Sequence, residues 1–186
     1  LEDCTVLGSD GLDSIDVGGV VQKAPDHGGV GVRLDGSTLH AAGCTIAGGD
    51  GGSDVVPICA PGGDGAVGLE LVGASVARVR DSVLTGGVGG EGACFSPDGS
   101  DALSQSIEPG SEAISLVGTA RTFGASSPVL SGEILEVVLR GEPGDFAILH
   151  LGQELAAGVY VESLDVAFHL PLPPLSTLAF GVLPSS

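Results

Sequence analysis

One short motif recurs three times in the first half of the chain and limits its fold more than any other feature. The copies begin at Glu2, Ala42 and Arg80, so they start 40 and 38 residues apart. A repeat of this length predicts stacked structural units, each of which needs its neighbours to bury a core. Since the first copy starts at Glu2, we also expect the chain to begin within a repeat and to leave an open β edge there.

A fuller repeat unit is visible over Gly31–Ile46 and again over Gly68–Leu84. Each unit contains three short β-prone pieces, and apolar residues alternate within them, as in a half-buried strand. Three strands per repeat predict one coil of a parallel β-helix, in which equivalent residues of successive coils stack. We expect ladders of Cys4, Cys44 and Ser82 and of Val6, Ile46 and Leu84. Arg33 and Glu70 fall at comparable positions and are expected to pair on the outer face.

The residues beyond one minimal coil fall at the same point of every repeat, after the third β-prone piece. These insertions span Ser9–Val30, Asp50–Val67 and Gly87 to about Ile107, and all three are rich in Gly, Asp and Ser. Asp-Gly pairs are typical of tight turns, so we interpret the insertions as loops. Insertions on one face of a solenoid often form its binding surface.

The pattern changes after Ile107, where longer β-prone runs alternate with prolines. These runs are Ala113–Val117, Ile134–Leu139, Phe146–Leu151, Val159–Val161, Leu164–Leu170 and Thr177–Leu183. Short strands separated by proline-containing turns predict an antiparallel β-sandwich-like domain. The sequence therefore predicts an all-β chain with a short right-handed parallel β-helix over residues 1–107. A small β-sandwich-like domain over 112–186 follows, with the linker at Ser106–Glu112.

The stretches Gly31–Ser53 and Gly68–Gly92 resemble the right-handed parallel β-helix repeats of secreted bacterial proteins, in particular glycine-rich surface proteins of the planctomycete and myxobacterial type. The segments Ser127–Phe146 and Leu170–Pro173 look like part of a small β-rich domain attached to such proteins. The resemblance implies an extracellular or cell-surface location in bacteria. It implies no particular activity, because a fold does not fix a function.

The charge balance excludes several classes of partner. The chain carries 24 acidic and six basic residues, which gives a formal net charge of −18. Nucleic acid is excluded because no basic stripe can neutralise phosphates, and an anionic membrane surface would repel the chain. No uninterrupted apolar run is long enough to cross a bilayer, so we expect no membrane insertion.

The four cysteines indicate an oxidising compartment. Cys59 and Cys94 lie in loop-like stretches next to prolines and are predicted to form a disulfide. Cys4 and Cys44 occupy the same repeat position, and two interpretations remain open for them: a bond between them, or free thiols stacked as small core residues.

Calcium is the one cofactor that the sequence suggests. Four aspartates precede glycine in the insertions, and hard cations favour such oxygen-rich clusters. These are Asp10, Asp50, Asp64 and Asp98. The spacing of calcium-binding β-roll repeats is not met, so the ordinary use of Asp-Gly in turns is the competing interpretation.

The function that follows is a non-catalytic extracellular structural or adhesive protein. Self-association through an open β-helix end would make it a subunit of a surface filament, and extracellular glycans are further expected partners. The alternative is a carbohydrate-binding or polysaccharide-degrading β-helix protein, with Asp35 or Glu70 as acid–base residues. Against that alternative, the chain contains no Trp and one Tyr, whereas sugar-binding grooves usually contain aromatic platforms.

Overall fold

The computed structural model describes residues 1–17, 20–55, 59–125, 137–151, 159–161, 166–168 and 176–182. Every regular element within these ranges is a β-strand, so the all-β expectation is confirmed. The chain divides into two compact units, Leu1–Ala120 and Arg121–Ser186.

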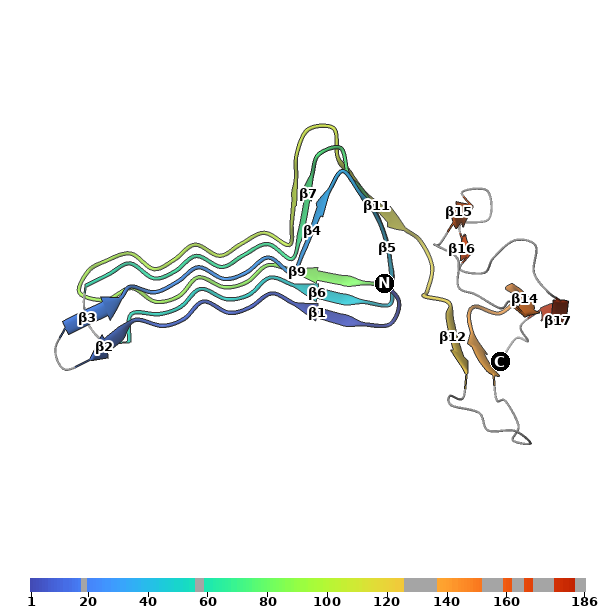
Figure 1. Cartoon of the computed structure of the whole chain (residues 1–186), viewed down its shortest axis with the longest axis horizontal. Helices are drawn as coiled ribbons and strands as arrows, with labels where there is room; N and C mark the ends of the chain where they lie inside the picture. Colours follow the sequence, from blue (N-terminus) through green and yellow to red (C-terminus); the bar gives the residue numbers. More distant parts are fainter. Residues whose placement is uncertain are drawn as a thin grey trace. The chain divides into compact units, whose positions relative to one another are not determined.

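Three parallel three-stranded sheets form one part of the first unit, which we call the prism because Figure 1 shows its sheets as the sides of a triangle. Each sheet takes one strand from each of three successive repeats. The first sheet contains β1 (Thr5–Leu7), β6 (Thr45–Ala47) and β9 (Val83–Thr85); the second contains β4 (Val32–Asp35), β7 (Leu69–Val72) and β10 (Gln105–Ile107); the third contains β5 (Thr38–Ala42), β8 (Val76–Arg80) and β11 (Glu112–Leu116). The period of the sequence repeat is therefore the period of strand stacking.

The prism core is small and aliphatic. Ile46, Leu69 and Leu71 are completely buried, and Ala77 joins them from the third sheet. Val6 pairs with Ile46, and Ile46 pairs with Leu84, so the expected apolar ladder is confirmed. Burying the stacked side chains between layers supplies the driving force that a single layer lacks.

The parallel sheets extend further along the chain than the predicted β-helix region. Gln105–Ile107 pairs with Leu69–Leu71, and Glu112–Leu116 pairs with Val76–Arg80. The segment expected to be a linker therefore lies within a third layer of strands. Every residue of β10 is exposed, so this segment lacks the alternation of buried apolar and exposed polar residues that would predict a strand of the sheet.

The three insertions form a second part of the same unit, which we call the arm. Figure 1 shows extended traces that run side by side from the prism to a distant end. Each insertion contributes an outbound and a return segment, and the insertions define layers 1 to 3 in chain order. Layer 1 contains residues 8–14 and 26–31, layer 2 contains 48–54 and 62–68, and layer 3 contains 86–92 and 99–104. At the far end of layer 1, β2 (Ile15–Val17) and β3 (Val20–Lys23) pair as an antiparallel hairpin.

The second unit contains antiparallel strand pairs in its described part. β12 (Thr122–Ala125) pairs with β13 (Val137–Arg140), β14 (Phe146–Leu151) with β17 (Ser176–Val182), and β15 (Val159–Val161) with β16 (Val166–Phe168). Antiparallel pairing agrees with the sequence prediction. Parts of the expected strands Ile134–Leu139, Leu164–Leu170 and Thr177–Leu183 lie outside the described residues.

Candidate functional site

The backbone hydrogen bonds of the arm repeat every three residues. In layer 2, the Gly48 N–H donates to the carbonyl of Thr85, the last residue of β9 (3.0 Å), and the Gly51 N–H donates to the Val88 carbonyl of layer 3 in the same way (2.8 Å). The intervening Gly49 N–H donates across to Gly29 of a return segment (2.9 Å). The N–H groups of successive residues thus point in different directions, and the directions repeat about every three residues. A backbone with this period has the geometry of a polyproline II helix. The arm is therefore a bundle of such helices.

The hydrogen bonds across the arm join all six segments in one zigzag. Starting at the Ser9 carbonyl, each segment accepts a bond from the next, alternating between outbound and return segments. The donors along this path are the N–H groups of Gly29, Gly49, Ala66, Gly87 and Ala102, with N···O distances of 2.7–3.0 Å. A polyproline II helix has no internal hydrogen bonds, so these contacts between segments satisfy its backbone.

Glycine is required where the segments touch. A Cβ on Gly49 would lie 2.0 Å from the Ser9 carbonyl oxygen, and a Cβ on Gly87 would lie 1.9 Å from the Gly49 oxygen. Both glycines are buried, whereas Asp50 and Val88, which follow them, are exposed. The constraint matches that of collagen, where only glycine fits at the crowded axis.

The four aspartates predicted as turn or calcium residues lie on this bundle, and each accepts a backbone hydrogen bond from another segment. Asp10 Oδ1 accepts from the Asp50 N–H (3.1 Å), and Asp50 Oδ1 accepts from the Val88 N–H (2.7 Å). Asp64 accepts from Ser100 (2.7 Å), and Asp98 accepts from Gly92 (2.9 Å). Neither these aspartates nor the glycines that follow them have positive φ, and the chain makes no turn at any of the four positions, so the structure does not show the tight-turn use.

These carboxylates satisfy outward-facing N–H groups that no neighbouring carbonyl reaches. The same role falls to Asp13, which accepts from Ser53 (2.8 Å), and to Asp101, which accepts from Gly89 (2.9 Å). Sequence reasoning missed this role of Asp13 and Asp101. The signal that could have found them is the period-three pattern of Gly-Gly-x in Gly48–Gly52 and Gly86–Gly90. Within the described ranges, no group of three or more Asp, Glu, His or Cys side chains could hold a metal ion, and calcium binding stays a prediction.

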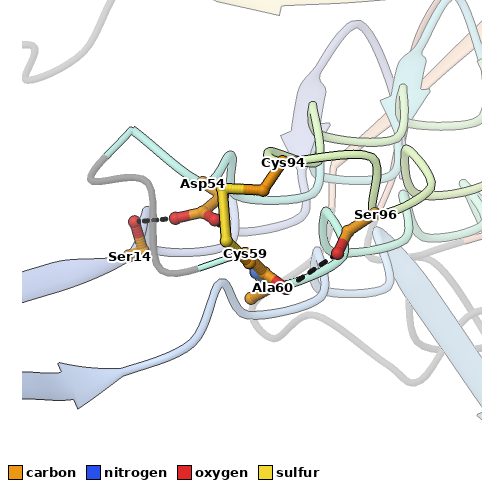
Figure 2. The surroundings of a disulfide bond; sticks show 6 residues. All are labelled: Ser14, Asp54, Cys59, Ala60, Cys94 and Ser96. Carbon is orange, nitrogen blue, oxygen red and sulfur yellow. Dashed lines mark hydrogen bonds between the residues drawn. A yellow bond between two sulfur atoms is a disulfide. The ribbon is translucent and has the colours of Figure 1, made fainter.

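The far end of the arm is cross-linked, as Figure 2 shows. Cys59 and Cys94 form the predicted disulfide, which joins layer 2 to layer 3. Layer 1 is attached as well, because the buried Ser14 hydroxyl donates to Asp54 Oδ1 (2.8 Å). The other oxygen of Asp54 accepts from the Ala60 N–H (3.0 Å). All three layers are therefore tied at this end.

Apolar side chains are exposed around this cross-link. Phe95, next to the disulfide, has a relative exposure of 109%, and Val55 has one of 61%. Phe95 follows Cys94 and Val55 follows Asp54, so both exposed side chains adjoin the cross-linked end of the arm, which makes this end a candidate contact surface.

Cys4 and Cys44 are free thiols whose sulfur atoms lie 3.3 Å apart and share a hydrogen bond. The Cys44 N–H donates to Ser82 Oγ (3.0 Å), which completes the expected Cys-Cys-Ser ladder. The hydrogen bond to Cys44, together with partial burial, raises the pKa of the Cys4 thiol. Of the two interpretations left open by the sequence, the structure shows the stacked thiols.

The residues considered for acid–base chemistry are surface residues of the prism. Arg33 and Glu70 pair in register and form an ion pair at 3.1 Å on the outer face, as predicted, while Asp35 is exposed at the end of β4. A cavity of about 330 Å³ lies beside the last prism layer. Its lining contains Ser, Gln and aliphatic residues without any charged residue, histidine or cysteine, so it offers no acid–base group.

Among the described residues, no helix is long and apolar enough to cross a membrane. Comparison of the chain with protein-family models, with curated proteins and with solved structures finds no match.

Proposed function

We propose that this chain is a non-catalytic extracellular structural or adhesive protein, in which a short right-handed parallel β-helix carries a stiff glycine-rich arm. The three parallel sheets, with one strand of each repeat in every sheet, support the β-helix. The strand pairs of the second unit support a small antiparallel sandwich-like domain. The Cys59–Cys94 disulfide supports an oxidising, extracellular or cell-surface location.

The observation that carries the proposal is the construction of the arm. Its six segments are bonded to one another through their backbones, and its far end is held by a disulfide and by the Ser14–Asp54 bond. A rigid element that ends in exposed Phe95 and Val55 is suited to hold a contact surface away from the rest of the protein. Extracellular glycans are the partners that we propose for this surface.

Adhesion can be tested by measuring retention of the purified chain on cellulose, chitin and alginate beads. We expect retention on at least one of them, and loss of retention in the variant Val55→Ser/Phe95→Ala. The matched control is Leu103→Ala, which removes an exposed apolar side chain of the arm away from the disulfide. Absence of retention on all three, or equal retention of both variants, would remove the adhesive part of the proposal and leave the structural part.

Catalysis can be tested on the same polysaccharides in soluble form. We expect no depolymerisation, with or without calcium, because the described cavity lining offers no acid–base group. Depolymerisation that disappears in Asp35→Ala or Glu70→Ala would instead establish the carbohydrate-degrading alternative.

A further inference from the structure

The layers of the arm are joined by a repeating row of donors and acceptors. The Gly11 N–H of layer 1 donates to the Asp50 carbonyl of layer 2 (2.7 Å), and the equivalent Gly51 N–H donates to the Val88 carbonyl of layer 3 (2.8 Å). One helical turn further on, Ser14 donates to Ser53 (3.0 Å) in the same manner. In the backbone-to-backbone bonds between outbound segments, the lower-numbered layer therefore supplies the N–H groups and the next layer supplies the carbonyls, while side chains such as Asp10 accept N–H groups in the opposite direction.

Layer 3 has equivalent donors, and two of them are already occupied. Gly89 and Gly92 hold the positions that Gly51 and Asp54 hold in layer 2. Instead of donating to a further layer, Gly89 donates to Asp101 Oδ1 (2.9 Å) and Gly92 donates to Asp98 Oδ1 (2.9 Å). Both aspartates are exposed residues that follow the far end on the return path of the same layer. They fill the place that a neighbouring backbone would take.

Layer 1 has the complementary acceptors. The carbonyls of Asp10 and Asp13 are equivalent to those of Asp50 and Ser53, which accept bonds from the preceding layer. In the part of the chain that the structure describes, no backbone N–H donates to the Asp10 or Asp13 carbonyl. The backbone acceptors at the outer edge of layer 1 thus match the backbone donors at the outer edge of layer 3, as they do at each internal interface.

We propose that the outer edges of layers 1 and 3 form a self-association surface for a second copy of this chain, and that Asp98 and Asp101 cap the layer 3 edge and block it. The occupant is a second copy because the two edges carry the backbone donors and acceptors of the interface already present between layers. Such a head-to-tail contact does not close on itself, so removal of the caps produces open-ended oligomers. The mechanism corresponds to the protection of exposed strand edges against pairing.

The test compares three double variants by sedimentation velocity over a wide range of concentrations. Asp98→Ala/Asp101→Ala removes the acceptors, whereas Asp98→Asn/Asp101→Asn removes the charges and keeps an acceptor oxygen at each position. Asp35→Ala/Glu108→Ala is the matched control for charge, since both residues are exposed on the prism. We expect the unmodified chain, the Asn variant and the control to sediment alike, without association through the arm edges. We expect the Ala variant to form species of two or more chains whose mass rises with concentration.

The proposal is overturned if the Ala variant is folded and monomeric. It is also overturned if the Asn and Ala variants associate equally, because the loss of charge repulsion would then explain the association. A measurement on the unmodified chain guards against misfolding of the Ala variant. In the unmodified chain, amide hydrogen exchange at Gly89 and Gly92 should be at least about fivefold slower than at the same residues of the Ala variant or of an unstructured peptide of residues 86–92. A roughly fivefold reduction is the protection expected from one hydrogen bond. Exchange at the peptide rate in the unmodified chain would show that the caps do not form. Adhesion is a separate readout, so failure of either proposal leaves the other intact.

Discussion

At the residue scale, two roles alternate along each arm segment. An inner glycine lets two backbones approach to hydrogen-bonding distance, and an outer residue faces solvent and often accepts an N–H from the next layer. Gly87 and Val88 illustrate the pair: the first is buried against the Gly49 oxygen and the second is exposed. The arm therefore tolerates many outer residues and few inner ones.

We expect Gly87→Ala to destabilise the first unit by about 3 kcal/mol or more, because the new Cβ would lie 1.9 Å from a backbone oxygen that cannot move without breaking the zigzag. Thermal unfolding followed by circular dichroism measures the effect. Val88→Ala, in the same triplet, is the control and should change stability by less than about 0.5 kcal/mol. Equal effects of the two substitutions would contradict the tight packing of the bundle.

The thiol pair gives a second expectation at this scale. The folded state raises the pKa of Cys4 through its hydrogen bond to Cys44, so the folded chain holds the thiol proton more tightly than the unfolded chain. The resulting stabilisation is complete below the unfolded pKa and is lost as pH rises through the folded pKa. Above about pH 8.5, the ordinary pKa of a cysteine thiol, urea unfolding midpoints should therefore fall more steeply with pH in the unmodified chain than in Cys4→Ser/Cys44→Ser. Parallel pH profiles would exclude this contribution.

At the scale of elements, the second unit begins with a charged connection between a strand and a turn. Arg121 donates to both carboxylate oxygens of Asp145 (3.0 and 3.1 Å) and pairs with Glu142 at 3.3 Å. The hydrogen bonds to Asp145 raise the pKa of the Arg121 guanidinium. Since Asp145 also accepts from the Glu142 N–H (2.7 Å), the pair fixes the turn between β13 and β14 next to β12.

We expect Arg121→Ala to destabilise the second unit by about 1 kcal/mol, a value reduced by the partial exposure of the pair to solvent. The single tyrosine, Tyr160, lies in this unit, so its fluorescence during urea unfolding reports on the second unit alone. Arg140→Ala removes an exposed arginine of β13 and serves as the control. A larger loss with Arg140→Ala than with Arg121→Ala would refute the role of the pair.

At the scale of the whole molecule, cross-links and charge determine how the repeats hold together. The disulfide closes a stretch of 35 residues and joins neighbouring layers of the arm. By the loop-closure entropy of the unfolded chain, Cys59→Ala/Cys94→Ala should cost about 4 kcal/mol in the free energy of unfolding. Urea unfolding of the variant and of the reduced unmodified chain should give matching midpoints. A variant as stable as the oxidised chain would contradict the expectation.

The formal net charge is −18, so the excess carboxylates repel one another within the folded chain. Asp10 and Asp50, for example, place carboxylates in adjacent layers of the arm. Raising NaCl from about 0.01 M to about 0.3 M should therefore raise the melting midpoint, because salt screens the repulsion. Calcium chloride at matched ionic strength provides the comparison. A calcium-specific increase that disappears in Asp50→Ala would support the calcium prediction, and a fall in the midpoint with NaCl would refute the repulsion argument.

The sequence by itself determined the features that depend on local periodicity. Alternating apolar residues and the regular repeat were enough to predict the parallel strands, the Val6–Ile46–Leu84 ladder and the Arg33–Glu70 pair, because stacking places equivalent residues of successive repeats together. The cysteine positions predicted the Cys59–Cys94 bond. The period-three glycines were also present in the sequence, but they were interpreted as turns.

Only the tertiary structure decided what the glycine-rich insertions become. A polyproline II segment makes no hydrogen bonds within itself, so nothing local distinguishes it from a loop. Its partners are segments about 20 to 40 residues away, such as Ser9, Gly29 and Gly49. The same reason hides the role of Asp98 and Asp101, since an acidic residue on the return path becomes a cap only when the outbound segment of its own layer leaves an N–H group within its reach.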